Sequence, residues 1–217
     1  MDDRQKQLLT FVVEDVIETG EPVGSQYLVE SHRLNVSPAT IRNWFAELET
    51  DGFLFQPHTS AGRVPTEKGY QFYLEDLMEE MPLSKREAQE LRKAHDLKSF
   101  AKRVAELSEN AVLIGFDDAD TFYTGLSHLF AQPEFHDWNR IVTLGAMLDH
   151  LDDVLHHIRR TTYDEPTAFI GNDCPFDNGC GSMMLTLADG TLVGLLGPMR
   201  MDYQQGMAIL KFAKEIF

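Results

Sequence analysis

The dipeptide Ser37-Pro38 fixes where a helix must begin, and it constrains the first eighty residues more than any other feature. Proline tolerates the first position of a helix, because the N–H it lacks would have no helical partner there. Serine is a preferred residue at the N-cap. The predicted helix runs to about Asp51 and ends at Gly52. A helix of this length must bury one face against neighbouring segments.

Two predicted helices precede this helix, and a small hairpin follows it. Apolar residues at four-residue steps, stops at glycine and capping hydroxyls give the boundaries. The expected segments are helices over Asp3–Thr19 and from a cap at Ser25 to about Ser31, extended pieces at Phe53–Gln56 and Val64–Pro65, and a fourth helix from its cap Thr66 to about Glu80. Three helices followed by a hairpin is the order of a winged helix-turn-helix, whose second and third helices are joined by a short turn.

The third helix divides into two faces at 100° per residue. Ile41, Phe45 and Leu48 are expected to face the core, with Trp44 packing at its border. The opposite face and its flanks carry small or hydrogen-bonding residues: Ala39, Thr40, Arg42, Asn43, Ala46 and Thr50. Small residues allow close approach to a DNA groove, and arginine and asparagine have donors for base edges or phosphates. On an isolated amphipathic helix such residues are usually only solvated, but the flanking helices and hairpin favour groove binding.

The hairpin tip and two serines complete the candidate DNA-binding set. Ser37 caps the helix whose N-terminus can bind a phosphate, and Ser25 begins the preceding helix. In the tip, Gly62 is expected to provide a permissive turn, and Arg63 to reach a phosphate or the minor groove. For His58, a weak phosphate contact and packing within the hairpin remain equal alternatives. The full predicted set is Ser25, Ser37, Ala39, Thr40, Arg42, Asn43, His58, Thr59, Ser60, Gly62 and Arg63.

The overall charge opposes DNA binding at long range. The 217 residues carry a formal net charge of −16, whereas protein–DNA affinity depends on neutralising phosphates. Residues 30–70, however, hold nearly equal numbers of acidic and basic side chains. No apolar run is long enough for a membrane span, and the N-terminus lacks the basic and apolar regions of a signal peptide. We therefore expect a cytoplasmic protein with no membrane partner.

Several blocks of the sequence resemble the family of the heat-inducible transcription repressor HrcA. In the first third the blocks are Gly20–Ser25, Ser37–Asn43 and Pro57–Thr66 with Gly69-Tyr70. Later blocks are Leu126–Phe135, which contains Gln132-Pro133-Glu134-Phe135, then Phe169–Gly171 and Gly197–Tyr203. The order and spacing of the first three blocks make the resemblance specific for the DNA-binding half, and the later blocks extend it beyond a generic winged helix.

The resemblance implies a repressor of chaperone genes that binds an inverted-repeat operator, called CIRCE, as a homodimer. It also implies that the chaperonin GroEL favours the active repressor, and that no catalysis is involved. Family members carry a GAF-like domain, interrupted by a dimerisation insert, after the winged helix. Here the chain passes from Ala111–Phe116 through the acidic turn 117–120 almost directly to Tyr123. Most of the insert and the middle of the GAF-like domain are therefore missing.

The predicted fold class is α+β: a winged-helix DNA-binding domain over residues 1–81, a helical linker over 82–110, and a truncated GAF-like regulatory and dimerisation domain over 111–217. Ser84 and Glu87 form a capping-box pattern for a helix or helix pair through Glu109. The later predicted elements are a strand at Ala111–Phe116, a helix from Asp137 to about Arg160, strands at Thr167–Gly171, Ser182–Leu187 and Leu192–Gly197, and a helix at Gln204–Phe217.

Other residues that could carry chemistry have simpler explanations. Cys174 and Cys180 have the wrong spacing for a zinc knuckle. The acidic helix that carries His150, His156 and His157 is expected to be solvated. Arg200 is expected to form an ion pair with Asp202. We therefore expect no metal, no cofactor and no enzymatic activity.

Two hypotheses for function remain. The first is a DNA-binding repressor of the stress response, which Arg42, Asn43 and Arg63 favour. The alternative is a protein-interaction module with weakened DNA binding, which the acidic balance favours. Pairing is expected through the C-terminal domain with help from the linker helix, unless their apolar residues form the domain's own core. The candidate pairing residues are Leu97, Phe100, Ala101, Val104, Leu107, Phe212, Ile216 and Phe217. The operator sequence and any effector stay open.

Overall fold

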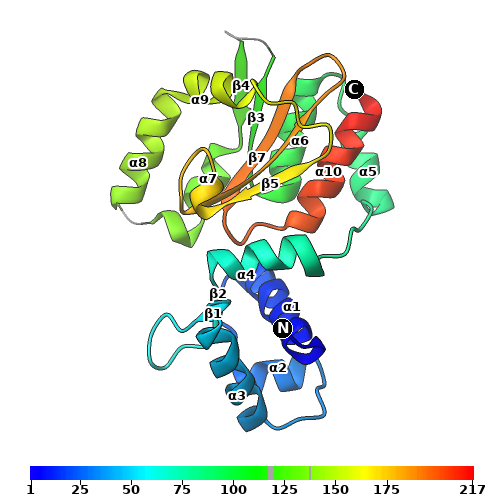
Figure 1. The fold of residues 1–217 in the computed structure, drawn as a ribbon. Helices are drawn as coiled ribbons and strands as arrows, with labels where there is room; N and C mark the ends of the chain where they lie inside the picture. The colour runs from blue at the N-terminus through cyan, green and yellow to red at the C-terminus, as the bar shows by residue number, and fades with distance from the viewer. Residues whose placement is uncertain (117–119, 137) are drawn as a thin grey trace. The chain divides into compact units, whose positions relative to one another are not determined.

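The computed structural model describes residues 1–116, 120–136 and 138–217. These residues form two compact units, Met1–Glu79 and Glu80–Phe217 (Figure 1). Most of the acidic turn expected at 117–120, and the expected helix start at Asp137, lie outside the described residues.

The first unit follows the predicted order of three helices and a hairpin. Its elements are α1 (Asp3–Thr19), α2 (Ser25–Ser31), α3 (Pro38–Thr50), β1 (Leu54–Phe55), β2 (Val64–Pro65), α4 (Glu67–Phe72) and a π-helical segment (Tyr73–Leu77). The two strands pair antiparallel, with Leu54 opposite Pro65. The fourth helix is shorter than expected, because regular α-helix ends at Phe72 and the π-helical segment follows.

Most helix boundaries in this unit arise from the predicted capping residues. The Ser37 hydroxyl accepts a hydrogen bond from the Thr40 N–H at 3.1 Å, and Pro38 is the first helical residue. Gly20 ends α1 in a left-handed conformation with φ 71°. The expected cap at Ser25 is wrong. The extended residue before α2 is Gly24, so Ser25 is already helical and its hydroxyl is free for another partner.

The core of the first unit lies where α1 and α3 meet the hairpin. Ile41, Phe45 and Leu48 of α3 are at most 2% exposed, which confirms the predicted core face. Apolar residues from the other elements complete this core: Leu8, Leu9, Val12, Val13, Leu28, Leu54, Tyr70 and Tyr73. The two-residue strands contribute little to the core, so helix packing holds this unit together.

The second unit contains a five-stranded antiparallel sheet with the order β4-β3-β7-β6-β5. The strands are β3 (Ala111–Gly115), β4 (Thr121–Thr124), β5 (Thr167–Ile170), β6 (Cys180–Thr186) and β7 (Leu192–Pro198). The helices are α5 (Lys85–Leu91), α6 (Leu97–Ser108), α7 (Leu126–Ala131), α8 (Trp138–Asp149), α9 (Leu151–Ile158) and α10 (Tyr203–Ile216), with short 3-10 turns at Pro133–Phe135 and Gly171–Asp173. The chain as a whole is therefore α+β.

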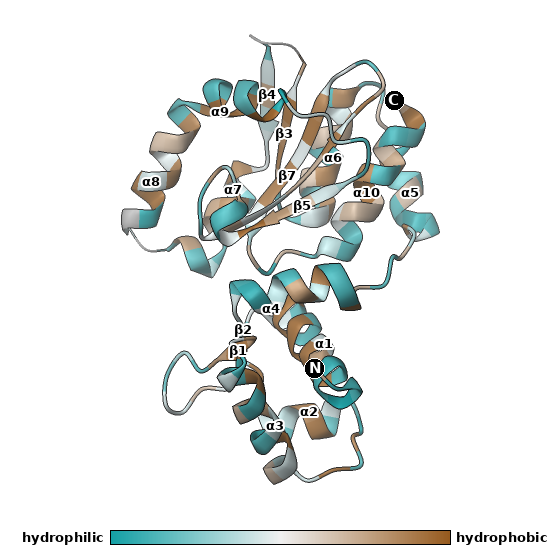
Figure 2. Ribbon diagram, in the orientation of Figure 1, coloured by the Kyte–Doolittle hydropathy of each residue, from teal (hydrophilic) through white to brown (hydrophobic). Residues whose placement is uncertain are grey.

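Helices cover both faces of this sheet. Figure 1 shows α8 and α9 on one side and α6 and α10 on the other. Every residue of β3 and β7 is buried, and the sheet is predominantly apolar in Figure 2. Antiparallel strands usually alternate apolar and polar residues, because one face meets water. Here both faces are covered, which explains why these strands are almost continuously apolar.

Three features of the second unit differ from the sequence-based expectation. Strand β4 and helix α7 were not predicted, and the long helix after Asp137 is divided at His150 into α8 and α9. The helices before β3 form a pair with two capping boxes, at Ser84 and Asp96. Phe100, Ala101 and Val104 of α6 are buried within this unit. Phe212 of α10 is buried as well, so the expectation that these four side chains help two copies to pair is wrong.

Candidate nucleic-acid interface

The outer face of α3 is exposed, as its residue pattern predicts. Ala39, Arg42, Asn43, Ala46 and Thr50 are all exposed, and Thr40 is half-buried beside the cap. The helix thus presents one amide, one guanidinium and one hydroxyl among small side chains. Such a face can enter a groove closely and offer donors to base edges.

Arg42 is oriented by a residue of another helix. Its Nη1 donates a hydrogen bond to the Ser25 hydroxyl at 3.3 Å. Among the described residues, no carboxylate lies within ion-pair distance of this guanidinium, so its charge is not neutralised inside the unit. The structure therefore brings together two predicted site residues, Ser25 and Arg42, that lie 17 positions apart.

The N-terminus of α1 borders the same helix, a feature that the sequence did not indicate. The Arg4 guanidinium lies 5.6 Å from the centre of the Trp44 ring. Gln5 Nε2 donates a hydrogen bond to Glu47 Oε2 at 3.0 Å. Trp44 is half-buried, as expected for a packing residue, and Glu47 is exposed with its carboxylate bound to Gln5. These contacts connect the start of α1 to α3, in addition to the contact between Ser25 of α2 and Arg42 of α3.

The hairpin tip is exposed and held by its own hydrogen bonds. His58, Thr59 and Ser60 are exposed, and the Gln56 side-chain amide donates to the carbonyl oxygens of Thr59 and Ala61 at 3.1 and 2.9 Å. The His58 Nδ1 lies 3.4 Å from the Ser60 hydroxyl. The exposure of His58 favours the surface alternative over packing within the hairpin.

Gly62 is required for a reason other than the expected turn. Its backbone is outside the left-handed region, so glycine is not needed there for a positive φ. A Cβ atom at this position would lie 2.3 Å from the backbone carbonyl of Val23. The close approach arises because Val23 and Arg63 exchange two backbone hydrogen bonds, of 2.9 and 2.8 Å. Gly62 therefore permits the hairpin to pack directly against the α1–α2 connection.

Arg63 does not extend from the tip as expected. Its Nε lies 2.9 Å from Glu49 Oε1, and its Nη2 donates a hydrogen bond to Glu49 Oε2 at 3.1 Å. The guanidinium also lies 5.6 Å from the centre of the Phe45 ring, and the side chain is only 18% exposed. The sequence could not show this pairing. Glu49 lies in α3, next to the core residue Leu48, whereas Arg63 lies in the hairpin. Arg63 connects the hairpin to α3.

A hydrogen-bonding contact between His32 and the buried Asp15 connects α1 to the end of α2. His32 Nε2 lies 2.9 Å from Asp15 Oδ2, and Asp15 is only 5% exposed. The His32 ring also stacks on Phe11, with ring centres 3.9 Å apart. Neither residue was among the predicted functional residues. Together they fix the backbone immediately before the turn that leads to α3.

Acidic residues outnumber basic ones in this unit. Residues 1–79 contain 14 Asp and Glu against 6 Lys and Arg. One carboxylate, Glu14, is partly buried beside Tyr73, and burial raises the pKa of Glu14 above its usual value. A DNA-binding surface on this unit must therefore rely on a few well-placed cations.

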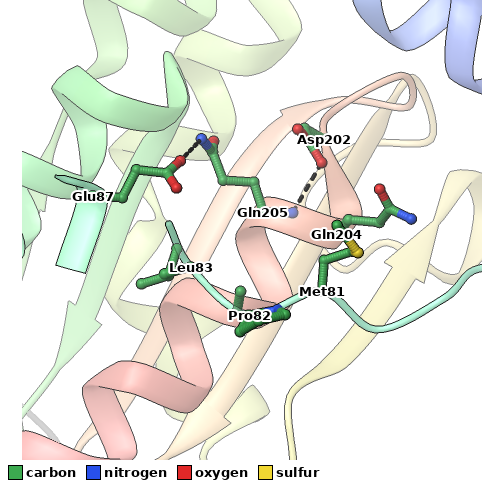
Figure 3. A pocket seen from close by; sticks show the side chains of 8 residues that line it. Met81, Pro82, Leu83, Glu87, Asp202, Gln204 and Gln205 are labelled. Carbon is green, nitrogen blue, oxygen red and sulfur yellow. Dashed lines mark hydrogen bonds between the residues drawn. The ribbon is translucent and has the colours of Figure 1, made fainter. Parts of the chain in front are cut away.

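The second unit has a small surface pocket of about 170 Å³ (Figure 3). It lies between the segment at Met81–Leu83, the start of α5 and the start of α10. Gln205 Nε2 donates a hydrogen bond to Glu87 Oε1 at 2.8 Å, while the Gln205 N–H donates to Asp202. Hydrogen bonds from Ser84 and then Gln205 lower the pKa of Glu87. These polar groups bind one another and join the start of α5 to the start of α10. The pocket therefore has a structural role.

Arg200 has different partners from the one expected. Its Nη2 donates to Gln132 Oε1 at 2.7 Å, and its Nε lies 2.5 Å from Glu134 Oε1. The predicted pairing with Asp202 is wrong, because the Asp202 carboxylate instead caps α10 through the Gln205 N–H. The ion pair joins residues 66 positions apart and is less than one-third exposed on either side. It therefore fixes the 132–134 segment against the loop before α10.

The cysteines and histidines that could be considered for metal binding differ in their exposure to solvent. Cys174 and Cys180 are buried, and burial raises the pKa of both thiols. His150, His156 and His157 are exposed. Within the described ranges, no three His, Cys, Asp or Glu side chains are arranged to hold a metal ion, and no helix is long and apolar enough to cross a membrane.

The chain is similar to known proteins over most of its length. A family model described as the HrcA protein C terminal domain matches residues 69–207. The heat-inducible transcription repressor HrcA of Symbiobacterium thermophilum is 43% identical over 164 residues, which are 70% of this chain and 45% of that protein. The repressor of the same name from Pelotomaculum thermopropionicum is 47% identical over 98 residues, 45% of this chain and 28% of that protein. The matched regions thus span less than half the length of these relatives.

One solved structure has a similar fold. It is described as a crystal structure of a hypothetical protein at 2.2 Å resolution, and it has a TM-score of 0.75 and 21% sequence identity. The match covers 99% of this chain and 97% of that chain. At this identity the similarity concerns the fold alone.

Proposed function

Because the chain belongs to the HrcA family, we propose that it is a transcription repressor whose first unit binds an operator in duplex DNA. In this proposal the first unit is a winged helix-turn-helix, in which α2 and α3 form the helix pair and the β1–β2 hairpin is the wing. The observation that carries the proposal is the outer face of α3, where Asn43 projects among small residues beside Arg42, whose guanidinium meets no carboxylate among the described residues.

The proposal places α3 in the major groove. Ala39 and Ala46 allow the helix backbone to approach the base edges, and Asn43 has the paired donor and acceptor that recognise adenine. Arg42 lies at the flank of this face and is held by Ser25, which suits contact with a guanine edge or a neighbouring phosphate. The capped N-terminus of α3 adds a positive dipole directed toward the backbone.

The hairpin contributes contacts from its tip. Exposed His58, Thr59 and Ser60 have side chains that can donate to phosphates or to the minor groove. We assign Arg63 to holding the hairpin against α3, because Glu49 already neutralises its guanidinium. This assignment replaces the expected Arg63–phosphate contact.

The second unit is proposed to be a truncated GAF-like domain that pairs two copies of the chain. Two-fold pairing suits an inverted-repeat operator of the CIRCE type. With Phe100 and Val104 committed to the core, the exposed apolar residues of α8 are a better candidate for pairing. Trp138 and Val142, one helical turn apart, are 73% and 53% exposed. Control of chaperone genes and a response to the chaperonin GroEL complete the proposal by analogy with the family.

A second function is favoured by one observation. The excess of carboxylates in residues 1–79 opposes association with phosphates, as expected of a protein-interaction module with weakened DNA binding. The two functions predict different behaviour with DNA of different sequence. A repressor discriminates between operator and mismatched duplex, and an interaction module does not.

The test is a fluorescence-anisotropy titration of the full chain with an inverted-repeat chaperone-promoter duplex and with a mismatched duplex. The wild type should bind the operator more tightly, and the preference should weaken by about 1–3 kcal/mol in Asn43→Ala. Glu18→Gln, at an exposed position of α1, serves as a control for surface changes outside the proposed interface. Equal binding of both duplexes by the wild type would contradict repression and support the interaction module.

A further inference from the structure

Arg33 has a backbone conformation that arginine seldom adopts. Its φ is 51°, in the left-handed region, and Glu109 is the other non-glycine residue with a positive φ in the part of the chain that the structure describes. Side chains with a Cβ are disfavoured there, because the Cβ crowds the following carbonyl oxygen. Residues of this kind are held in place by the surrounding structure, and they cluster at functional sites.

The strain arises from the way in which α2 ends. The Leu34 N–H donates a hydrogen bond to the Val29 carbonyl oxygen at 3.1 Å, and the His32 N–H donates to the Leu28 carbonyl oxygen. This is the pattern of a helix C-terminus in which the residue at position 33 turns left-handed, a position usually occupied by glycine. The hydrogen bonds require the backbone conformation but not the arginine side chain.

The Arg33 side chain makes no compensating contact within the protein. It is exposed, and within the described residues no carboxylate, carbonyl group or aromatic ring binds it. Three other cations of the first unit differ in this respect: Arg4 pairs with Asp2, Arg63 pairs with Glu49, and Lys68 donates to the Asp51 carbonyl oxygen. Arg33 thus resembles Arg42, whose guanidinium also meets no carboxylate.

The position of Arg33 is fixed relative to the proposed interface. The preceding residue, His32, is held by the buried Asp15 and by stacking on Phe11. Four residues later, Ser37 caps the start of α3. The first unit has a large excess of carboxylates, yet the guanidinium groups of Arg33 and Arg42 meet none of those that the structure describes. Arg33 lies in the turn before α3, and Arg42 lies in the second turn of α3.

We propose that Arg33 binds a DNA phosphate beside the start of α3, and that arginine stands in place of glycine at this turn for that contact. The inference rests on the proposed DNA-binding function and adds a residue to it. A phosphate contact contributes affinity without sequence preference, and it makes binding more sensitive to salt. Arg33 should therefore affect binding to operator and mismatched duplexes equally.

The test compares Arg33→Gly with two matched controls in the full chain. Glu109→Gly replaces the other left-handed non-glycine residue, which is exposed and lies in the second unit. Arg86→Gln removes an exposed cation from the second unit. Binding to operator and mismatched duplexes is measured by anisotropy between about 50 and 200 mM salt, and folding is followed by thermal denaturation.

We expect Arg33→Gly to fold with an unchanged or raised thermal midpoint and to lose several-fold affinity for both duplexes. The log–log dependence of affinity on salt should flatten by about 0.9 for one lost phosphate contact. Both controls should bind DNA as the wild type does. If the wild type binds neither duplex, the proposed function itself fails.

Three results would overturn the Arg33 inference while leaving the proposed function intact. The first is wild-type affinity and salt dependence in Arg33→Gly. The second is a lowered thermal midpoint, which would assign Arg33 a structural role. The third is loss of preference for the operator, which would place the side chain against a base edge and not a phosphate.

Discussion

Both units use polar side chains to hold their own segments together, but the first unit also presents polar side chains along the exposed face of one helix. In the second unit, Arg200 binds Gln132 and Glu134, and Glu87 binds Gln205, so polar groups hold segments of the same unit together. In the first unit, Arg42 and Asn43 lie exposed on α3 without a carboxylate partner in the described residues. A polar side chain that is satisfied internally stabilises the fold, whereas one that is exposed and unpaired is available to a partner. The comparison separates structural residues from candidate binding residues within one chain.

The largest effect should come from the core of the second unit. Leu196 of β7 is fully buried beneath the helices that cover the sheet, so Leu196→Ala should lower the free energy of unfolding by about 2–5 kcal/mol. Val142→Ala, at an exposed position of α8, should change it by less than about 0.5 kcal/mol. Chemical denaturation measures both. Similar values for the two variants would contradict the buried three-layer arrangement.

The Arg200 ion pair should have the next largest effect on stability. Arg200→Ala leaves Glu134 and Gln132 without their donor in a partly buried site, and about 1–3 kcal/mol of stability should be lost. DNA affinity per folded molecule should not change. A double-mutant cycle with Glu134→Gln isolates the interaction, and additive losses would show that the two residues are not coupled.

Arg63 and Arg42 provide the sharpest comparison within the first unit. Arg63→Ala should destabilise this unit by about 1 kcal/mol, because the contacts with Glu49 and the Phe45 ring are lost. Arg42→Ala should leave stability nearly unchanged and flatten the log–log salt dependence of DNA binding by about 0.9 if the arginine contacts one phosphate. Anisotropy measures the salt dependence of DNA binding for both variants, and thermal denaturation measures their stability. The opposite assignment of the two effects would place Arg63 on the DNA.

The smallest effect concerns the partly buried Glu14. Because burial raises the pKa of this carboxyl in the folded protein, the folded state binds its proton more tightly than the unfolded state. Stability should therefore decrease as the pH rises from the ordinary pKa of 4.5 through the raised value. Glu14→Gln removes this cost and should be slightly more stable than the wild type at neutral pH.

The Glu14→Gln gain should disappear below the ordinary pKa, where the wild-type side chain is neutral in both states. Glu18→Gln, at an exposed position of the same helix, is the control. Denaturation curves at several pH values measure the difference. A gain that is independent of pH would show that Glu14 is not the group responsible.

Local rules explain which parts of the fold were predictable from the sequence. Ser37 and Pro38 fix the start of α3 through contacts within one turn, and the apolar period of α3 identifies its buried face. The buried runs of β6 and β7 were likewise recognisable. Strand β4 was not, because its residues are only partly buried at the edge of the sheet.

The partners of long side chains could not be predicted in this way. Arg63 binds Glu49, 14 positions away, and Arg200 binds Glu134, 66 positions away. Only the packed structure brings these charges together. Arg33 is a different case. Its residue type conflicts with the backbone conformation at its position, and that conflict becomes visible only when φ is known.

The contact between Gly62 and Val23 has a consequence for how operator preference can change among related chains. Two backbone hydrogen bonds join the hairpin to the α1–α2 connection, and no side chain larger than hydrogen is tolerated at residue 62 without movement. Under the proposed function, the spacing along DNA between bases read by α3 and phosphates touched by the hairpin is then constant. New preferences must arise by exchange of side chains on α3 or at positions 58–60. Substitutions that merely reposition the hairpin would first have to break this backbone pairing, and so would lower stability before they altered specificity.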